Sequence, residues 1–353
     1  MANVSVVRGS AVERARSPAD RPLIEVRDLQ THFVTEEGIV RAVDGASFEI
    51  YPGRTLGVVG ESGCGKSVAA RSILQIVDKP GRIVGGEIIY RSARGINGSA
   101  VDLLTLSHDG NEMRSVRGGA ISMIFQEPMS SFSPVHTFGN QIMEAIRLHG
   151  DFSAREAHAL AVTWLERVGM PNPERRLSEY PHQLSGGQRQ RAMIAMALAT
   201  NPEMLIADEP TTALDVTTQA QILDLLRRLQ ADNGMAIMFI THDLGVVAEM
   251  ADEVAIMYLG RMVERGPVDA IYNDPKHPYT RALLTSIPRI NAQARQRLPS
   301  IVGAIPHPYN RPSGCPFHPR CPSYIAGTCE LRPPVLVQVG DQHKAACFLY
   351  EGA

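Results

Sequence analysis

The sequence predicts an α/β fold built on a largely parallel sheet, with an appended C-terminal segment. Short apolar strands alternate with apolar-periodic helices over residues 23–266, an order that gives parallel strands with ligands at their carboxyl edge. The run GESGCGKS at 60–67 matches the phosphate-binding pattern G-x-x-x-x-G-K-[ST]. After Gly266 proline becomes frequent, and residues 275–329 contain no Asp or Glu. This change in composition predicts a domain boundary after residue 266.

Length and composition allow one or two domains and exclude several classes of protein. The formal net charge of the 353 residues is −2, which gives no sign of a nucleic-acid partner. No apolar run is long enough to span a bilayer, since the longest, 192–199, ends at Thr200, Asn201 and Pro202. Residues 1–22 lack the apolar core of a secretory signal. We expect them to form a disordered extension of a cytoplasmic chain whose membrane work is done by another subunit.

The first half of the chain shows strand patterns around the glycine-rich loop. Residues 23–33 and 43–50 alternate apolar and polar side chains, as half-buried strands do. Residues 54–59 form an apolar strand that leads into the loop, and 66–77 continue as a helix. This strand–turn–helix order is the context that a phosphate-binding loop requires. Residues 120–125 predict another buried strand, with Gln126 at its end.

The second half predicts an inserted helical part and two further strands. Residues 128–190 are mostly helical in pattern and richer in charge, which indicates a helical subdomain. Residues 204–207 and 235–240 read as buried strands separated by a helix over 217–229. The alternation of strands and helices places the residues that follow each strand at one edge of the sheet.

Residues 60–67 carry the chemistry of a nucleotide site: Gly60, Glu61, Ser62, Gly63, Cys64, Gly65, Lys66 and Ser67. The glycines let successive backbone N–H groups face the β- and γ-phosphates. Lys66 supplies a positive charge there, and the Ser67 hydroxyl can bind Mg²⁺. We interpret Cys64 as a small residue at a tolerant position rather than as a redox switch.

A second phosphate-binding signature stands at LSGGQ, 184–188. Ser185, Gly186, Gly187 and Gln188 open the apolar-periodic run RAMIAMALA, which makes a second helix N-terminus able to bind an anion through backbone N–H groups. One nucleotide needs only one phosphate-binding loop. The second signature therefore predicts that each nucleotide is sandwiched between two subunits.

Four polar residues at predicted strand ends are candidates for metal binding and hydrolysis. Asp208 ends the strand in LIADEP and can hold Mg²⁺ through water, and Glu209 beside it is the candidate general base or water-positioning group. Gln126 can reach both the metal shell and the attacking water. His242, which follows the strand 235–240, can contact the γ-phosphate and stabilise developing charge.

Taken together, these motifs resemble those of the ATP-binding-cassette (ABC) ATPases. The resemblance covers roughly residues 23–266 and rests on GESGCGKS, FQEP, LSGGQ, LIADEP, TALD and ITHDL in the order and at the spacings of that family. It implies a P-loop NTPase ABC cassette with a mostly parallel sheet, an antiparallel β part and a helical subdomain. It implies ATP and Mg²⁺ as ligands, with Ser67, Gln126 and Asp208 near the metal.

The same resemblance implies roles across a subunit interface. Ser185 and Gly187 would contact the γ-phosphate of ATP held by a second ABC ATPase subunit, and Asp215 would bridge the two subunits. An aromatic residue near the first strands would stack on adenine. Phe33 is the nearest candidate, and a role in the core is equally open for it.

The C-terminal sequence is similar to one branch of the family, the oligopeptide/dipeptide importer ATPases. The segments YLGRMVERGPVDAIYNDPKHPYTRALLTSIP (258–288) and GCPFHPRCP (314–322) carry this similarity. GKSVAARSIL, FQEPMSSFSP and RQRAMIAMAL are closer to the D-type than to the F-type partner of a paired ATPase. The branch implies two transmembrane permeases, a periplasmic solute-binding protein and a place on the cytoplasmic face of the inner membrane.

Two questions of function stay open on the sequence. Relatives within the branch take up nickel chelates, opines or oligosaccharides, and the ATPase itself does not touch the cargo. A soluble ABC ATPase of DNA repair or translation is a rival from another class, although the second cassette or long coiled-coil insert typical of it is not visible. A non-hydrolysing partner is disfavoured because Glu209 and His242 are both present.

Four cysteines cluster in the C-terminal segment, 267–353: Cys315, Cys321, Cys329 and Cys347. Disulfides are unexpected in a cytosolic chain, which leaves a [4Fe–4S] cluster, a zinc ion or free buried thiols. The spacing C-x5-C-x7-C-x17-C lacks the close pairs typical of zinc sites, and the resemblance to importer ATPases favours the cluster. Basic residues of the acid-free segment would offset its charge: Lys276, Arg281, Arg289, Arg295, Arg297, Arg311 and Arg320. The expected role is a structural staple for a proline-rich tail, apart from the catalytic set.

Overall fold

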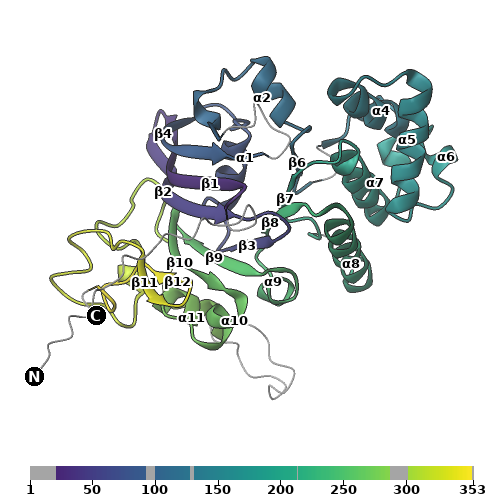
Figure 1. Cartoon of the computed structure of the whole chain (residues 1–353). Helices are drawn as coiled ribbons and strands as arrows, with labels where there is room; N and C mark the ends of the chain where they lie inside the picture. Colours follow the sequence, from purple (N-terminus) through teal and green to yellow (C-terminus); the bar gives the residue numbers. More distant parts are fainter. Residues whose placement is uncertain (1–20, 93–99, 128–130, 213, 287–300, 352–353) are drawn as a thin grey trace, which may run out of the picture.

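The computed structural model describes residues 21–92, 100–127, 131–212, 214–286 and 301–351. Within these ranges the chain forms two sheets, a helical layer to one side, and a C-terminal segment on the opposite side (Figure 1). Almost all of the predicted extension 1–22 lies outside the described residues. Within these ranges, no helix combines the length and apolar character needed to cross a membrane.

The larger sheet has the order β11-β12-β10-β9-β3-β8-β7-β6. Its parallel strands are β6, β7, β8, β3 and β9, and the hairpin partner β10 and the strands β12 and β11 run antiparallel. The bounds are β3 Thr55–Val59, β6 Ile121–Ile124, β7 Met204–Asp208, β8 Ala236–Ile240, β9 Glu253–Tyr258, β10 Arg261–Pro267, β11 Val337–Gly340 and β12 His343–Ala345. Every residue of β3, β6, β7 and β8 is buried, as expected of parallel strands covered on both faces. The four predicted buried strands are confirmed.

The smaller sheet is antiparallel, with the order β2-β1-β4-β5. Its strands are β1 Ile24–Thr35, β2 Gly38–Ile50, β4 Gly81–Tyr90 and β5 Val101–Asp102. The predicted strands at 23–33 and 43–50 correspond to β1 and β2, which continue to the turn between them. The sequence did not predict β4, whose three glycines (Gly81, Gly85 and Gly86) and half-exposed surface hide the strand pattern.

Two predicted helices differ in length from the observed ones. Helix α1 spans Lys66–Ile73 and stops before the predicted residue 77, because Gln75 has a positive φ of 52° that a helix cannot contain. Helix α8 spans Val216–Asn233 rather than 217–229, since Asp215 caps its start and Gly234 ends it with φ 64°. In both cases the backbone at the helix end explains the difference.

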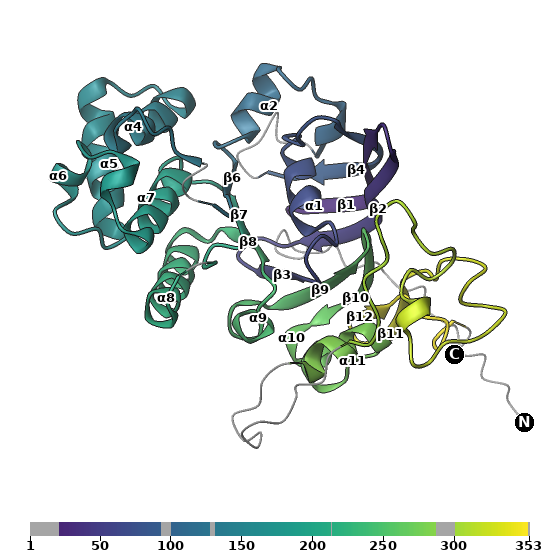
Figure 2. The same ribbon diagram turned by 180° about the vertical axis from the view of Figure 1, so that it is seen from behind.

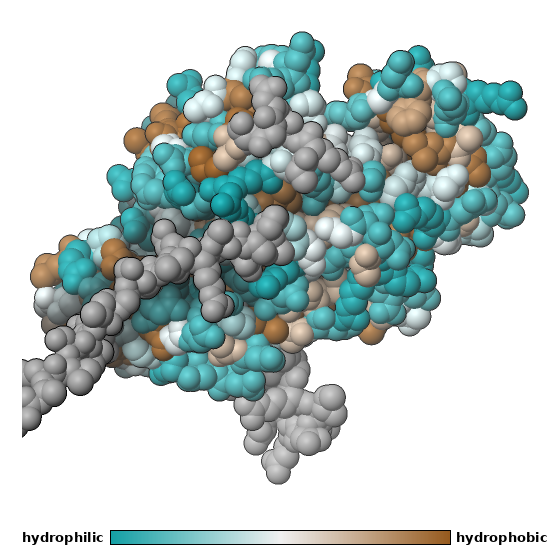
Figure 3. Space-filling model, in the orientation of Figure 1, coloured by the Kyte–Doolittle hydropathy of each residue, from teal (hydrophilic) through white to brown (hydrophobic). Residues whose placement is uncertain are grey.

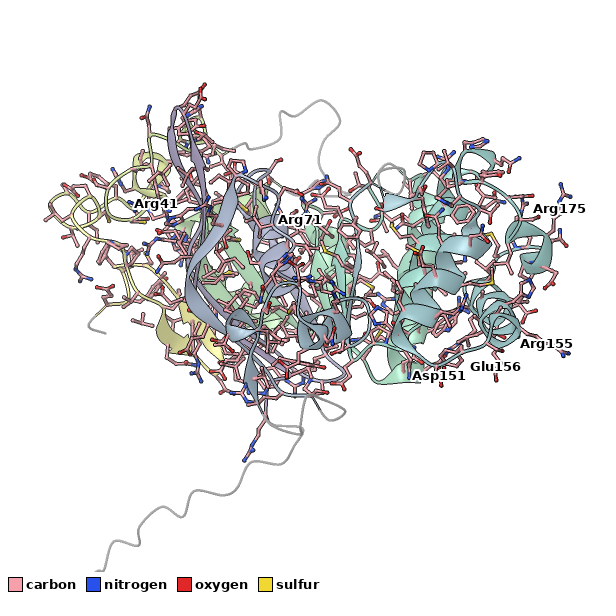
Figure 4. All side chains as sticks on the ribbon, turned by 90° about the horizontal axis from the view of Figure 1, so that it is seen from above. Arg41, Arg71, Asp151, Arg155, Glu156 and Arg175 are labelled. Atoms are coloured by element: carbon pink, nitrogen blue, oxygen red, sulfur yellow. The ribbon has the colours of Figure 1, made fainter. Side chains whose placement is uncertain are left out.

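Among the described residues between β6 and β7, the helical layer contains α4 Phe138–His149, α5 Ala154–Arg167, α6 Pro173–Arg176 and α7 Gly186–Leu198. Residues 128–130 of the predicted helical subdomain lie outside the described residues, and α7 extends past residue 190, the predicted end of that subdomain, through the apolar run that the sequence placed after LSGGQ. Figure 2 shows from behind how this layer stands clear of the antiparallel sheet. Seen from above, the charged side chains of Asp151, Arg155, Glu156 and Arg175 mark its far end (Figure 4).

Shorter elements connect these layers: η3 Leu103–Thr105, α2 Asn111–Val116, η4 Pro181–Gln183, α9 Leu244–Met250, α10 Val268–Asn273, α11 Pro278–Thr285 and η5 His318–Arg320. The C-terminal segment returns to the larger sheet, where β12 pairs with β10 at Glu264↔Ala345 and Arg265↔Lys344. A buried apolar cluster that includes Val59, Tyr258, Tyr279, Phe317 and Cys315 continues from the sheet into this segment. The C-terminal segment therefore shares its core with strands of the larger sheet.

Candidate functional site

The glycine-rich loop joins the end of β3 to the start of α1, as predicted. Gly65 has φ 104° at the helix start, and a Cβ there would lie 2.1 Å from the carbonyl oxygen of Ala42. A Cβ on Gly60 would lie 2.1 Å from the carbonyl oxygen of Met257. Both positions therefore require glycine. Ser62 and Gly63 form the exposed crown of the loop, where a phosphate can reach the backbone N–H groups.

Lys66 lies beneath this crown and is 5% exposed. Its Nζ donates to the carbonyl oxygens of Gly60 at 2.7 Å and Glu61 at 3.2 Å. The ammonium group is thus held within the loop, where its charge can face phosphate oxygens. Cys64 is buried beside it, with its sulfur 3.9 Å from Nζ, and burial raises the pKa of the thiol. A protonated buried thiol agrees with Cys64 as a packing residue.

Ser67 and Asp208 meet across the gap between α1 and β7. The Ser67 hydroxyl donates to Oδ1 of Asp208 at 2.9 Å. Burial raises the pKa of Asp208, Glu209 adds to that shift, and the bond from Ser67 opposes it. A divalent cation beside these oxygens would stabilise the charged carboxylate. The pair supplies the hard oxygen ligands that Mg²⁺ prefers.

Glu209 is the centre of a hydrogen-bonded group at the carboxyl edge of the sheet. Its Oε2 accepts from Nε2 of Gln126 at 3.0 Å and from the Thr212 hydroxyl at 2.9 Å. Its Oε1 lies 3.3 Å from Nδ1 of His242. The sequence predicted Gln126, Glu209 and His242 as separate candidates, and the structure brings all three together. Thr212 is a contact that the sequence reasoning missed, although it is the first residue of the TALD motif.

The geometry of β6, β7 and β8 explains this convergence. Gln126 follows β6, Glu209 follows β7 and His242 follows β8, and these three strands are parallel neighbours. Glu209 has a positive φ of 48°, and its N–H donates to the carbonyl oxygen of Ile240 at 2.9 Å. This uncommon conformation for a non-glycine residue aims the carboxylate at its partners. The arrangement can hold a water molecule and accept its proton.

The LSGGQ signature begins α7 with a complete capping box. The Ser185 hydroxyl accepts from the N–H of Gln188 at 3.4 Å, and Oε1 of Gln188 accepts from the N–H of Ser185 at 3.1 Å. Gly186 and Gly187 form the first turn. Figures 1 and 2 place α7 in the helical layer, away from α1. The structure therefore does not bring this signature to the phosphate-binding loop of the same chain.

Asp215 lies next to this signature at the start of α8. Its carboxylate accepts from the N–H of Thr218 at 2.9 Å and from the Thr218 hydroxyl at 2.7 Å, and these bonds lower the pKa of Asp215. A Cβ on Gly187 would lie 2.9 Å from the Thr218 methyl group. The α7 and α8 N-termini thus pack against each other, which fits the expected interface without testing it.

Phe33 lies in β1 opposite Gly81 of β4. A Cβ on Gly81 would come 2.7 Å from Cε1 of the Phe33 ring. The ring therefore covers Gly81 and is only half-buried. This contact supports a packing role, and stacking on adenine stays a prediction.

Known proteins share both the nucleotide site and the C-terminal segment of this chain. A family model described as ABC transporter matches residues 43–212, and one described as oligopeptide/dipeptide transporter, C-terminal region, matches residues 263–329. A protein of Sinorhizobium fredii, provisionally named peptide ABC transporter ATP-binding protein y4tR, is 52% identical over 327 residues, which cover 92% of this chain and 94% of the relative. The chain belongs to the ATP-binding proteins of ABC transporters.

Other relatives and two solved structures agree with this family. A Brucella melitensis protein, provisionally named as a peptide import ATP-binding protein, is 48% identical over 337 residues, which cover 94% of this chain and 98% of the relative. A dimeric ATP-binding cassette in a post-hydrolysis state bound to ADP and Pi is 26% identical with a TM-score of 0.60, covering 69% of this chain and 98% of that one. A dimeric bacterial ABC transporter cassette is 27% identical with the same TM-score of 0.60 and the same coverage. The ABC cassette predicted from the motifs is confirmed.

The C-terminal segment of this ABC protein brings its four cysteines around one small cavity. Cys315, Cys321, Cys329 and Cys347 line it together with apolar side chains such as Ile325 and Phe348. Burial, with a smaller contribution from the neighbouring cysteines, raises the pKa of Cys315 to about 12. Burial likewise raises the pKa values of Cys321 and Cys347.

Each of the four sulfurs also receives a backbone N–H group. Phe317, Ser323 and Leu349 donate to the cysteine two positions earlier, and Ile325 donates to Cys329 at 3.4 Å. Among the described residues, no group of three or more His, Cys, Asp or Glu side chains is arranged to hold a metal ion. The four thiols nevertheless surround one space and are oriented by backbone donors.

The basic residues of this segment do not gather around the cysteines as the sequence suggested. Arg320 pairs with Glu61, Arg311 with Asp44, and Lys276 with Asp274. Only Arg281, among the described basic residues predicted for this role, acts on a thiol, where it lowers the pKa of Cys347 against the effect of burial. The reason is that carboxylates compete for these cations: Glu61 and Asp44 of the ATPase part attract Arg320 and Arg311, and Asp274, two positions away, attracts Lys276. Arg289, Arg295 and Arg297 lie outside the described residues.

Proposed function

We propose that this ATP-hydrolysing ABC protein powers the import of peptides. The observation that carries the proposal is the match of residues 263–329 to the C-terminal region of oligopeptide/dipeptide transporters. The names of the Sinorhizobium and Brucella relatives support it. Nickel chelates, opines or oligosaccharides are the other cargoes expected from the branch.

The residues at the ends of the parallel strands and in the phosphate-binding loop account for ATP hydrolysis. Lys66 and the loop N–H groups bind the β- and γ-phosphates, and Ser67 and Asp208 hold Mg²⁺ with help from Gln126. Glu209 accepts the proton of the attacking water, and His242 stabilises charge on the γ-phosphate. Ser185 and Gly187 of a second ATPase subunit complete the site from the opposite side.

The partners proposed are an F-type ATPase or a second copy of this D-type chain, two transmembrane permeases and a periplasmic solute-binding protein. The chain would lie on the cytoplasmic face of the inner membrane as a peripheral subunit. Apolar side chains gather over the helical layer at the upper right of Figure 3, and the exposed Val135, Leu148 and Phe152 belong to this part of the chain. This surface supports a permease contact there.

Peptide import is tested by uptake in a host strain that lacks the gene. Uptake of labelled di- and oligopeptides should fall, return with the wild-type gene, and stay absent with a Glu209→Gln copy. Loss of nickel or sugar uptake with peptide uptake intact would contradict the peptide assignment. Purification without any membrane partner, together with normal uptake of all these solutes, would favour the soluble ATPase of DNA repair or translation.

We further propose that the four cysteines hold a [4Fe–4S] cluster as a structural staple. A zinc ion would need its sulfurs about 2.3 Å from one point, and no group of three or more of the described side chains is arranged to hold a single metal ion. Four cysteines around one cavity can serve a larger cubane, and backbone N–H groups near the sulfurs stabilise such ligands. When bound, the cluster would cross-link four chain segments of a proline-rich tail.

Metal analysis of anaerobically purified protein tests the cluster. The protein should be brown and contain about four irons per chain. Cys321→Ser should lose the iron and loosen residues 301–351, whereas Cys64→Ser, which does not line the cavity, should keep the iron. Colourless protein with one zinc and no iron would support the zinc site instead, and metal-free protein would leave buried thiols.

A further inference from the structure

A salt bridge connects the C-terminal segment to the phosphate-binding loop. The Arg320 guanidinium donates to both carboxylate oxygens of Glu61, with Nη1–Oε2 2.7 Å and Nη2–Oε1 3.1 Å. The side chain of Arg320 is 4% exposed and that of Glu61 is 20% exposed. Two parallel bonds between largely buried charges form a pair of defined geometry. No local sequence pattern predicts this contact between residues 259 positions apart.

The same stretch holds the loop at a second point. The Tyr279 hydroxyl accepts from the N–H of Glu61 at 2.9 Å. The Tyr279 ring packs against Tyr258 and Phe317, with centroids 4.6 and 5.3 Å apart. Arg320 adds a bond to the Tyr258 hydroxyl at 3.3 Å. Both the backbone and the side chain of Glu61 are therefore fixed by the region after residue 257.

Glu61 in turn touches the group that binds phosphate. Its carbonyl oxygen accepts from Nζ of Lys66 at 3.2 Å, and it also accepts from the N–H of Cys64 at 3.2 Å. A displacement of Glu61 would therefore move the lysine and the loop turn. A loop already held in its binding conformation binds its ligand more tightly, because less ordering is needed on binding.

Phe317 and Arg320 both lie between two of the cavity cysteines. The N–H of Phe317 donates to the Cys315 sulfur, and Arg320 is adjacent to Cys321. The N–H of Cys315 also donates to the carbonyl oxygen of Cys329 at 2.7 Å. The position of Arg320 thus depends on how residues 315–321 fold around the cysteine cavity.

We propose that residues 315–321 act as a brace for the phosphate-binding loop, with Arg320 as a positioning residue for ATP. The proposal rests on ATP binding at this loop and goes beyond it, since it makes nucleotide affinity depend on the order of the cysteine segment. The coupling is reciprocal, so bound nucleotide also orders residues 315–321.

Nucleotide affinity of purified variants tests the brace. Arg320→Ala should raise the Kd for a fluorescent ATP analogue with Mg²⁺ by about tenfold, within the usual range for coupled sites. The KM for ATP should rise in parallel, while kcat at saturating ATP stays within about twofold, because a rise in KM alone marks lost binding. Arg320→Lys, which keeps one charged donor, should recover part of the affinity. The control is Arg332→Ala, which removes the exposed tail pair with Glu351 and should leave the Kd unchanged.

A second variant separates the brace from general damage to the tail. Glu61→Gln weakens the same pair from the loop side, so its effect and that of Arg320→Ala should not add in the double variant. Hydrogen–deuterium exchange should show protection of residues 315–321 on nucleotide binding in the wild type and in Arg332→Ala, but not in Arg320→Ala.

The outcomes distinguish this inference from the proposed function. If the wild type binds ATP and Arg320→Ala binds it equally well, the brace is wrong and the ATPase assignment stands. Additive losses in the double variant, or equal losses for Arg320→Ala and Arg332→Ala, would also overturn it. If the wild type binds no nucleotide, the proposed function itself fails.

Discussion

At the scale of single residues, the hydrolytic group depends on one backbone conformation. Glu209 occupies a positive φ of 48°, and from there its two carboxylate oxygens reach Gln126 and His242 separately. Uncommon backbone angles of this kind concentrate at functional sites. The motif spacing predicted which residues take part, but it could not predict that Glu209 links the other two.

Glu209→Gln should bind ATP normally and lose turnover by about 10²–10⁴-fold, because an amide cannot accept the proton of water in the transition state. The measurement is ATP hydrolysis in the assembled transporter together with equilibrium ATP binding. Glu87→Gln, an exposed change in β4, serves as the control. Activity of Glu209→Gln within about threefold of the wild type would exclude a role of this size.

Asp44 shows how single charges join the tail to the antiparallel sheet. Burial of Asp44 by itself raises the pKa of the carboxyl, but Arg311 and Arg261 outweigh it and hold the pKa below its ordinary value. Arg311 approaches from the tail at 3.0 Å and Arg261 from β10 at 2.7 Å. Arg41, labelled in Figure 4, adds a further positive charge, and Nε2 of His32 lies 4.0 Å from Oδ1 of Asp44.

This arrangement predicts loss of stability in acid. Because the folded pKa of Asp44 is lowered, the unfolded chain binds the proton first as the pH falls below about 4. The stabilisation is present above that pH and disappears at a rate of up to about 1.4 kcal/mol per pH unit. Asp44→Asn should therefore remove this part of the slope in urea unfolding measured from pH 3 to 7. An exposed change, Asp232→Asn, should keep the wild-type slope; identical slopes for all three proteins would contradict the role of Asp44.

At the scale of elements, four of the five parallel strands of the larger sheet were predictable, and the antiparallel strands were only partly so. Strands β3, β7 and β8 are continuous apolar runs bounded by polar residues, which the sequence displays directly. The hairpin of β9 and β10 follows the predicted strands but was missed, although β9 is almost wholly buried. Its register and its pairing with β12 depend on a tail segment about eighty residues later, a contact that no local pattern contains.

The N-terminus of α7 is predicted to act on the nucleotide bound by a second ATPase subunit. Ser185 caps a helix that lies away from the phosphate-binding loop of its own chain, so its anion-binding end is free to face another nucleotide. Ser185→Arg should abolish hydrolysis at the site whose loop belongs to the partner and leave ATP binding to its own loop intact. Mixed dimers with one altered subunit measure this, with Ser153→Arg at the α5 cap as control. A monomer that hydrolyses ATP at the assembled rate, independent of concentration, would disprove the shared site.

At the scale of the whole molecule, the nucleotide site is connected to two parts of the chain, the C-terminal segment and the helical layer, which lie on opposite sides of it (Figure 1). The tail reaches the phosphate-binding loop through Arg320 and Glu61, while the helical layer follows β6 and Gln126 in the chain. The sequence located both parts by composition and motif. It could not show that the tail touches the nucleotide loop, because that contact depends on how the cysteine segment folds back on the sheet.

Gln126 connects the hydrolytic group to the helical layer. Beyond it, Phe132 packs edge-on against Phe138 at the start of α4, with centroids 4.7 Å apart. The side chain of Gln141 also accepts from the N–H of Ser133 at 2.9 Å. The segment after Gln126 is thus tied to α4 at two points, and Pro134 limits its backbone freedom; Pro128 lies outside the described residues. A shift of Gln126 on ATP binding would move the first helix of the layer.

Gln126→Ala should therefore uncouple transport from hydrolysis more than it weakens ATP binding. The altered chain keeps Lys66, Ser67 and Asp208, so the Kd for ATP should change little, whereas its link from Glu209 to α4 is lost. The measurement is solute transported per ATP hydrolysed in proteoliposomes, with Gln219→Ala on α8 as a control of the same residue type. If Gln126→Ala transports as much solute per ATP as the wild type, then Gln126 and α4 do not couple hydrolysis to the permease.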